Sequence, residues 1–157
     1  MRIINARAKE LNQIINIRRE AFLYCAPRYY DSIQVQNLLD DYNEDEILWM
    51  IENKCMFVCV EDGIIVGTSA WKDEYLRHVY VKPGFMGRGI GSKLISHAED
   101  DYRGRTNKSY TELGANTYAK AFYEKNGYHV VSREEDWNGT WGGFEYYLMH
   151  KDFVNHS

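Results

Sequence analysis

Residues 75–99 read YLRHVYVKPGFMGRGIGSKLISHAE, and they decide the fold because they join a strand to a helix through a glycine-rich loop. Residues 75–81 are rich in aromatic and β-branched side chains, as strands are. Pro83 and Gly84 end that strand, since proline has no N–H for the ladder and glycine tolerates positive φ. From Ile90 onward the apolar residues recur at helical intervals. The pattern therefore predicts a strand, a tight loop and a helix.

The start of this helix is a candidate anion site. The first N–H groups of a helix have no intrahelical partner and carry roughly half a positive charge. The glycines at 87, 89 and 91 would let the backbone close on a phosphate, and Arg88 and Lys93 add positive charge.

Two well-known phosphate loops do not fit this stretch. The mononucleotide loop requires Gly-Lys-Ser/Thr, whereas this chain has Gly91-Ser92-Lys93. The dinucleotide fingerprint Gly-x-Gly-x-x-Gly requires glycine where the chain has Ser92 or Leu94. A nucleotide-binding enzyme is therefore a weak alternative.

The composition indicates a single globular domain over residues 1–157, because 45% of the 157 residues are hydrophobic. A net charge of −4 argues against a nucleic-acid partner, which would require a basic face, and mildly favours a cationic one. Three cysteines without zinc-ligand spacing predict buried free thiols and no metal.

The first ten residues lack an apolar leader, and no apolar run approaches the ~18 residues of a membrane span. We expect a cytoplasmic protein without membrane contact.

The rest of the chain alternates between strand and helix patterns, which predicts an α/β (α+β) fold. The expected elements are a strand at 3–4, helices at about 8–22, 33–39 and 45–52, a hairpin of strands 56–60 and 64–71, a strand at 110–113, a helix at 117–125, and closing strands at 128–133 and 144–149. In the strand at 75–81, the spacing of Leu76, Val79 and Val81 breaks the alternation of a regular strand, as a β-bulge does.

Two motifs resemble the GNAT superfamily of acyl-CoA-dependent N-acyltransferases. The family's loop is usually Gln/Arg-x-x-Gly-x-Gly/Ala, which Gly89 and Gly91 match while Met86 replaces the leading residue. Residues 116–128, NTYAKAFYEKNGY, match the block Asn-x-x-Ala-x-x-Phe-Tyr-x-x-x-Gly-Phe/Tyr. The resemblance covers about residues 57–151. It implies a mixed, mostly antiparallel twisted sheet of about seven strands flanked by helices, with a V-shaped opening between strands 4 and 5.

The resemblance also implies a site for acetyl-CoA, the expected cosubstrate. The backbone of Val79 and Val81 would hold the acyl carbonyl and pantetheine, and Asn116 would anchor the cofactor or cap its helix. The loop around the pyrophosphate would comprise Met86, Gly87, Arg88, Gly89, Ile90, Gly91 and Ser92. Tyr123 resembles the general acid of the family, because a phenol near the leaving thiolate can donate its proton.

The proton acceptor and the amine pocket are less determined. Glu74, just before the strand at 75–81, is a candidate base, with His78, Tyr75 or water as alternatives. Aromatic residues that could bound the amine pocket are Tyr29, Tyr30, Trp71, Trp137 and Trp141.

We therefore expect an N-acetyltransferase that transfers acetyl directly from acetyl-CoA to a primary amine of a small molecule or peptide. The alternative is a non-catalytic acyl-CoA-binding or interaction module on the same fold. An exposed closing strand could support a homodimer.

Overall fold

A computed structural model describes residues 1–136 and 144–154, which form two compact units. The first unit comprises Met1–Ala21 and Asn43–Lys108, and the second comprises Phe22–Tyr42 and Ser109 to the C-terminus. Each unit has its own strands and helices. The expectation of one domain over residues 1–157 stays a prediction.

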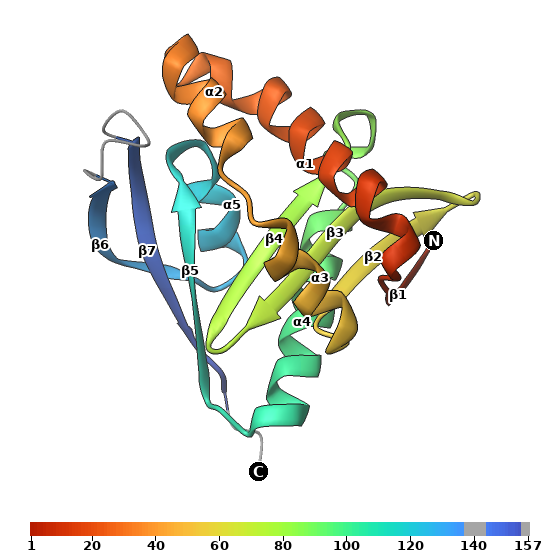
Figure 1. The fold of residues 1–157 in the computed structure, drawn as a ribbon. Helices are drawn as coiled ribbons and strands as arrows, with labels where there is room; N and C mark the ends of the chain where they lie inside the picture. Colours follow the sequence, from red (N-terminus) through yellow and green to blue (C-terminus); the bar gives the residue numbers. More distant parts are fainter. Residues whose placement is uncertain (137–143, 155–157) are drawn as a thin grey trace. The chain divides into compact units, whose positions relative to one another are not determined.

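Four antiparallel strands form the sheet of the first unit (Figure 1). They are β1 (Arg2–Asn5), β2 (Met56–Glu61), β3 (Ile64–Lys72) and β4 (Tyr75–Val81), and they lie side by side in chain order. Asp62 and Gly63, with φ of 51° and 78°, form the turn that connects β2 to β3. Two consecutive left-handed residues fit the right-handed twist of a hairpin, so the predicted hairpin is confirmed.

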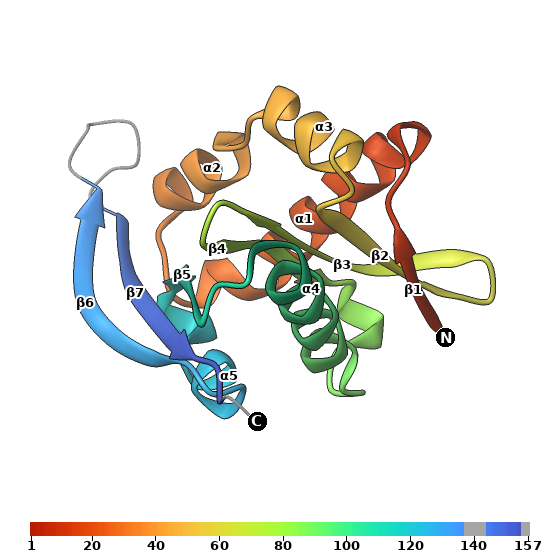
Figure 2. The ribbon, with the colours of Figure 1, turned by 90° about the horizontal axis from the view of Figure 1, so that it is seen from below.

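Helices cover both faces of this sheet, and Figure 2 shows α3 and α4 on opposite sides of β2–β4. The helical elements here are η1 (Ala8–Glu10), the first part of α1 (Leu11–Cys25), α3 (Glu44–Glu52), η3 (Pro83–Phe85) and α4 (Ile90–Thr106). Ile90 and Leu94 of α4 pack on Cys59 and Val66 in the core. Gly67 permits this close packing, because a Cβ there would lie 2.7 Å from the Leu94 side chain.

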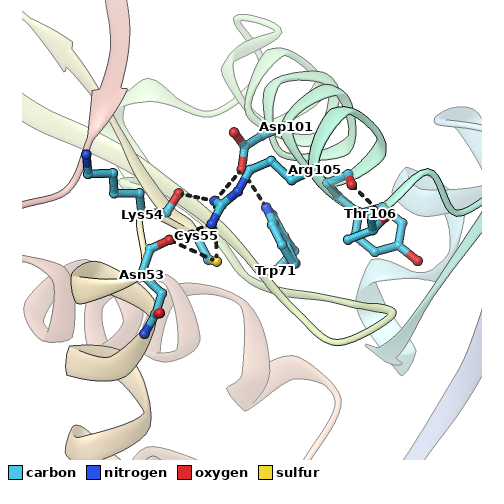
Figure 3. Close-up of polar contacts among 8 residues, drawn as sticks. Asn53, Lys54, Cys55, Trp71, Asp101, Arg105 and Thr106 are labelled. Carbon is cyan, nitrogen blue, oxygen red and sulfur yellow. Dashed lines mark hydrogen bonds and ion pairs between the residues drawn. The ribbon is translucent and has the colours of Figure 1, made fainter.

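Arg105, in the last turn of α4, ties that helix to the end of α3 (Figure 3). Its guanidinium donates to the backbone oxygens of Asn53 and Lys54 at 2.8 and 3.0 Å and to Asp101 at 3.1 Å. Asn53 is the C-cap of α3, so Arg105 satisfies carbonyls that the helix cannot pair itself. The same Asp101 carboxylate accepts the indole N–H of Trp71 at 2.8 Å.

We expect Arg105→Lys to destabilise the protein by about 1–2 kcal/mol. A single ammonium cannot reproduce the fork of the guanidinium, and each lost hydrogen bond contributes about 1 kcal/mol. Thermal unfolding should show a melting temperature lower by about 3–6 °C. Arg19→Lys, at an exposed position of α1, is the control. An equal shift of the melting temperature in both variants would show that the hydrogen bonds of Arg105 do not stabilise the fold.

The second unit holds three antiparallel strands, β5 (Tyr110–Asn116), β6 (His129–Asp136) and β7 (Phe144–Asp152), in the order β5-β7-β6. Its helical elements are the end of α1, η2 (Ala26–Arg28), α2 (Ser32–Asp40), η4 (Thr117–Ala119) and α5 (Lys120–Lys125). Asp31 caps α2 by accepting the backbone N–H of Gln34 at 2.8 Å.

The predicted fold class is confirmed, because the described residues hold seven strands, mostly antiparallel, and flanking helices. The bounds differ at element ends. The first helix runs to Cys25 and begins with a 3-10 turn, and the strand predicted at 110–113 extends to Asn116. The V-shaped opening would lie between strands of different units and stays a prediction.

All three cysteines are free thiols, with Cys55 and Cys59 buried and Cys25 half-buried. Among residues 1–136 and 144–154, no helix is long and apolar enough to span a membrane.

Candidate active site

The glycine loop leads from β4 into α4 through two left-handed residues. Gly87 and Gly89 have φ of 79° and 78°, and a Cβ at either would meet no atom within 4 Å. Backbone conformation, rather than lack of space, therefore favours glycine at both positions. Both residues are exposed, so the backbone of the loop is accessible.

The start of α4 fits an anion. Gly89 is the N-cap residue, no side chain caps the helix, and the first turn has no acidic residue. The first N–H groups of α4 therefore keep their partial positive charge without a side-chain acceptor. Ile90 and Gly91 are buried, whereas Ser92 is half-buried and Lys93 is exposed.

The positive charge of Arg88 is shared with Glu61 and is not directed at the start of α4 alone. Its guanidinium donates to Glu61 Oε1 at 2.8 Å and lies 5.4 Å from the centre of the Phe85 ring. An anion at the loop would compete with Glu61 for the Arg88 guanidinium. Met86, the residue that departs from the family pattern, is half-buried at the C-cap of η3.

The predicted bulge in β4 is confirmed. Thr68 pairs with Tyr80 and Ala70 with Arg77, so β4 has one more residue than β3 between these pairs. The extra residue falls at positions 78–79, where His78 has a left-handed φ of 52°. A bulge leaves backbone groups of the longer strand out of the ladder, next to the half-buried Val79.

Two hydroxyl residues of β3 border the bulge. Thr68 donates a hydrogen bond of 2.6 Å to the backbone oxygen of His78 and so fixes the distorted strand. Ser69 is fully buried, and its hydroxyl has no hydrogen-bond partner among the described residues. The sequence analysis did not single out either residue, and the only signal was a Thr-Ser pair within an apolar strand.

His78 is neutral in the folded protein at neutral pH. Burial of the imidazole, with the nearby positive charges of Arg18 and Arg77, lowers the pKa of His78 to about 4. A neutral imidazole can accept a hydrogen bond, but a group with so low a pKa is a weak base near pH 7.

We expect His78 to weaken the fold in acid. As the pH falls, the unfolded chain protonates this histidine near 6.5, whereas the folded chain does so only near 4. This part of the stability is therefore complete above about pH 6.5 and is lost as the pH falls to about 4, about 3 kcal/mol in all. Urea unfolding at several pH values measures the loss.

His78→Asn is the matched variant for this measurement, because asparagine tolerates a left-handed φ and does not titrate. Its stability should fall less steeply with acid than that of the wild type. If the free energies of unfolding of the two proteins fall in parallel as the pH is lowered, His78 does not have this role.

The other two candidate bases lie away from the bulge. Glu74 is in the turn between β3 and β4, after Asp73 with φ of 54°. At ~3.3 Å per residue, four residues place it at most about 13 Å along the chain from His78. Tyr75 is the first residue of β4, and its ring lies 5.7 Å from the Arg77 guanidinium.

In the second unit, residues 116–128 form a strand end, a 3-10 turn and a short helix. Tyr123 lies on α5, half-buried, with its ring 5.3 Å from Phe122 and 5.9 Å from Tyr128. The Asn116 side chain makes no cap, so the expectation that it caps the helix is wrong. Its amide lies 3.0 Å from the Tyr118 hydroxyl instead.

The residues expected at the amine pocket differ in exposure. Tyr29 is 59% exposed, and the Tyr30 hydroxyl is bonded to Thr117. Trp71 is buried at 8% exposure, and its N–H is committed to Asp101. Trp137 and Trp141 lie outside the described residues.

The loop and bulge belong to the first unit, and Asn116 and Tyr123 belong to the second. Their convergence on one ligand stays a prediction. Within the part of the chain that the structure describes, no three His, Cys, Asp or Glu side chains are placed to hold a metal ion.

A family comparison matches residues 52–130 to the acetyltransferase (GNAT) domain. A curated relative, the peptidyl-lysine N-acetyltransferase YjaB of Salmonella typhimurium, is 26% identical over 102 residues, which are 65% of this chain and 63% of that protein. The match thus spans less than two thirds of the relative's length.

Solved structures share the fold. The GCN5-related N-acetyltransferase of Rhodopseudomonas palustris superposes with a TM-score of 0.85 at 19% identity, over 97% of this chain and 95% of that one. The PaiA N-acetyltransferase of Thermoplasma acidophilum, solved with coenzyme A, has a TM-score of 0.75 at 19% identity, over 97% and 98% of the two chains.

Proposed function

The chain belongs to the acetyltransferase (GNAT) family, and on that premise we propose that it transfers acetyl from acetyl-CoA to a primary amine of a small molecule or peptide. The observation that carries the proposal is the uncapped start of α4, which follows an exposed glycine loop and has no acidic residue in its first turn. This is the arrangement that a pyrophosphate requires.

In this proposal the backbone of the loop holds the pyrophosphate of CoA. The residues are Met86, Gly87, Arg88, Gly89, Ile90, Gly91 and Ser92. Lys93 adds positive charge, and Arg88 does so when it leaves Glu61. Val79 and Val81 hold the acyl carbonyl and pantetheine through backbone groups beside the bulge, and the Asn116 amide contacts the cofactor.

Acetyl-CoA supplies an acetyl group activated as a thioester. The neutral amine attacks the carbonyl carbon, so that a C–N bond forms and the C–S bond breaks. Backbone N–H groups beside Val79 stabilise the negative charge that develops on the carbonyl oxygen. The Tyr123 phenol donates its proton to the leaving sulfur, whose thiol has a pKa of about 8.5.

The amine must lose a proton during the reaction. His78 stands at the bulge but is a weak base with its pKa of about 4. Glu74, in the turn before β4 and up to about 13 Å along the chain from His78, would take the proton through water rather than directly. We propose water as the immediate acceptor, with Glu74 as the carboxylate that could receive the proton from it.

The amine pocket is proposed at the exposed Tyr29, with Trp137 and Trp141 as further candidates. Trp71 is not included, because its ring packs 5.4 Å from Tyr102 in the core. A cationic amine would be attracted to aromatic faces, which agrees with a net charge of −4. A cytoplasmic location remains part of the proposal.

Two measurements test the function. Thermal unfolding should show that CoA and acetyl-CoA raise the melting temperature more than ATP does. Thiol release from acetyl-CoA should depend on an added amine, tested over polyamines, amino acids and lysine peptides. If neither CoA nor acetyl-CoA stabilises the protein, the proposal is wrong. Stabilisation without thiol release over the whole panel would favour the non-catalytic CoA-binding module.

A further inference from the structure

The hydroxyl of Tyr30 joins three parts of the second unit. It accepts the backbone N–H of Thr117 at 3.0 Å and lies 2.8 Å from the Thr117 hydroxyl. It also lies 3.4 Å from the backbone oxygen of Glu145 on β7, to which it donates. Tyr30 and Thr117 are 87 residues apart in the sequence, so the contact exists only in the folded chain.

This hydroxyl caps the helical segment that carries Tyr123. Thr117 is the first residue of η4, which runs directly into α5, and Asn116 at the N-cap position gives no side-chain bond. The first N–H groups of a helix require an external acceptor. Tyr30 supplies one, and a helix of six residues has too few bonds of its own to fix its start.

The surroundings of Tyr30 keep its hydroxyl in place and protonated. Its ring packs edge-on against Tyr118 at 6.2 Å, and Tyr118 lies within 3.0 Å of the Asn116 amide. A tyrosine hydroxyl is protonated at neutral pH, and burial raises the pKa of Tyr30 further. The Tyr30 hydroxyl can therefore donate one hydrogen bond and accept others at the same time.

We propose that Tyr30 is a positioning residue for the transfer reaction: its hydroxyl holds the start of η4 and thereby sets the place of the Tyr123 phenol. The inference rests on the proposed function, in which Tyr123 is the proton donor. Displacement of a reacting group by about 1 Å can cost about a hundredfold in rate. The loss of Tyr30 should therefore lower kcat rather than weaken cofactor binding.

Kinetics of four variants test this role. Tyr30→Phe keeps the ring and should lower kcat at least tenfold, with KM for acetyl-CoA changed less than twofold. Thr117→Val removes the partner hydroxyl and should lower kcat in the same direction, whereas Thr117→Ser keeps that hydroxyl and should retain most of the activity. Tyr24→Phe, on an exposed tyrosine of α1, is the matched control.

Amide hydrogen exchange gives a readout that does not depend on turnover. In Tyr30→Phe, exchange at Thr117 and along α5 should become at least tenfold faster, while exchange in β5 remains unchanged.

Three results would overturn the positioning role. They are unchanged exchange at Thr117, a kcat equal to that of Tyr24→Phe, or an effect confined to KM for the amine. If the wild type transfers acetyl to no amine, the proposed function fails, and the exchange experiment still decides whether Tyr30 holds the segment.

Discussion

Tyr123→Phe should lower kcat about a hundredfold, within the range that general acids contribute. Attack on the thioester expels a thiolate, which must gain a proton. A phenol of pKa about 10 can donate a proton or a hydrogen bond to this thiolate, whose thiol has a pKa of about 8.5. Phenylalanine keeps the ring that packs 5.3 Å from Phe122 and 5.9 Å from Tyr128. The fold and the affinity for CoA should therefore stay close to those of the wild type.

The measurement is kcat and KM at saturating acceptor over a range of pH. Tyr128→Phe is the control, because it removes the hydroxyl of a ring in the same cluster while phenylalanine is common at this place in the motif. We expect this variant to retain most of its kcat. An unchanged kcat in Tyr123→Phe would remove Tyr123 from the reaction without affecting the assignment of the CoA loop.

Gly89→Asp should weaken CoA binding by about tenfold to a hundredfold. A carboxylate about 5 Å from the pyrophosphate adds about 1–3 kcal/mol of repulsion for each pair of charges, depending on the local dielectric. A left-handed φ strains any side chain, but aspartate is among the residues that tolerate it best, and Gly63→Asp carries the same strain. Asp62 and Asp73 of this chain already have φ of 51° and 54°.

Gly63→Asp is the matched control for this variant. Gly63 has the same φ of 78° as Gly89, and a Cβ at either position meets no atom within 4 Å. Calorimetric titration with CoA should show a loss of affinity for Gly89→Asp alone, and the loss should shrink in high salt. Equal affinities for the two variants would mean that the start of α4 does not bind the pyrophosphate.

The features that could be predicted from the sequence are those that depend on neighbours along the chain. Pro83 and the glycines of the loop constrain φ directly, so the end of β4 and the start of α4 agree with the structure. The bulge was predictable because it shifts the alternation of Leu76, Val79 and Val81.

The features that could not be predicted depend on contacts between distant segments. Arg105 binds the carbonyls of Asn53 and Lys54, about fifty residues earlier, and no local pattern indicates such a pair. Trp71 is an aromatic residue of the kind that lines amine pockets, but in the folded protein its indole N–H donates a hydrogen bond to Asp101. By sequence, Asn116 could anchor the cofactor or cap its helix, and only the fold brings the Tyr118 hydroxyl to its amide.

Gly67 shows how a residue can resist substitution without taking part in the chemistry. A methyl group there would stand 2.7 Å from Leu94 and 3.1 Å from the backbone oxygen of Tyr80. A side chain there would require the Leu94 side chain to move, and a larger one would press on the backbone of β4 as well. In a screen of random variants, position 67 would tolerate as few replacements as a reacting residue, so intolerance in this family reports spacing as well as catalysis.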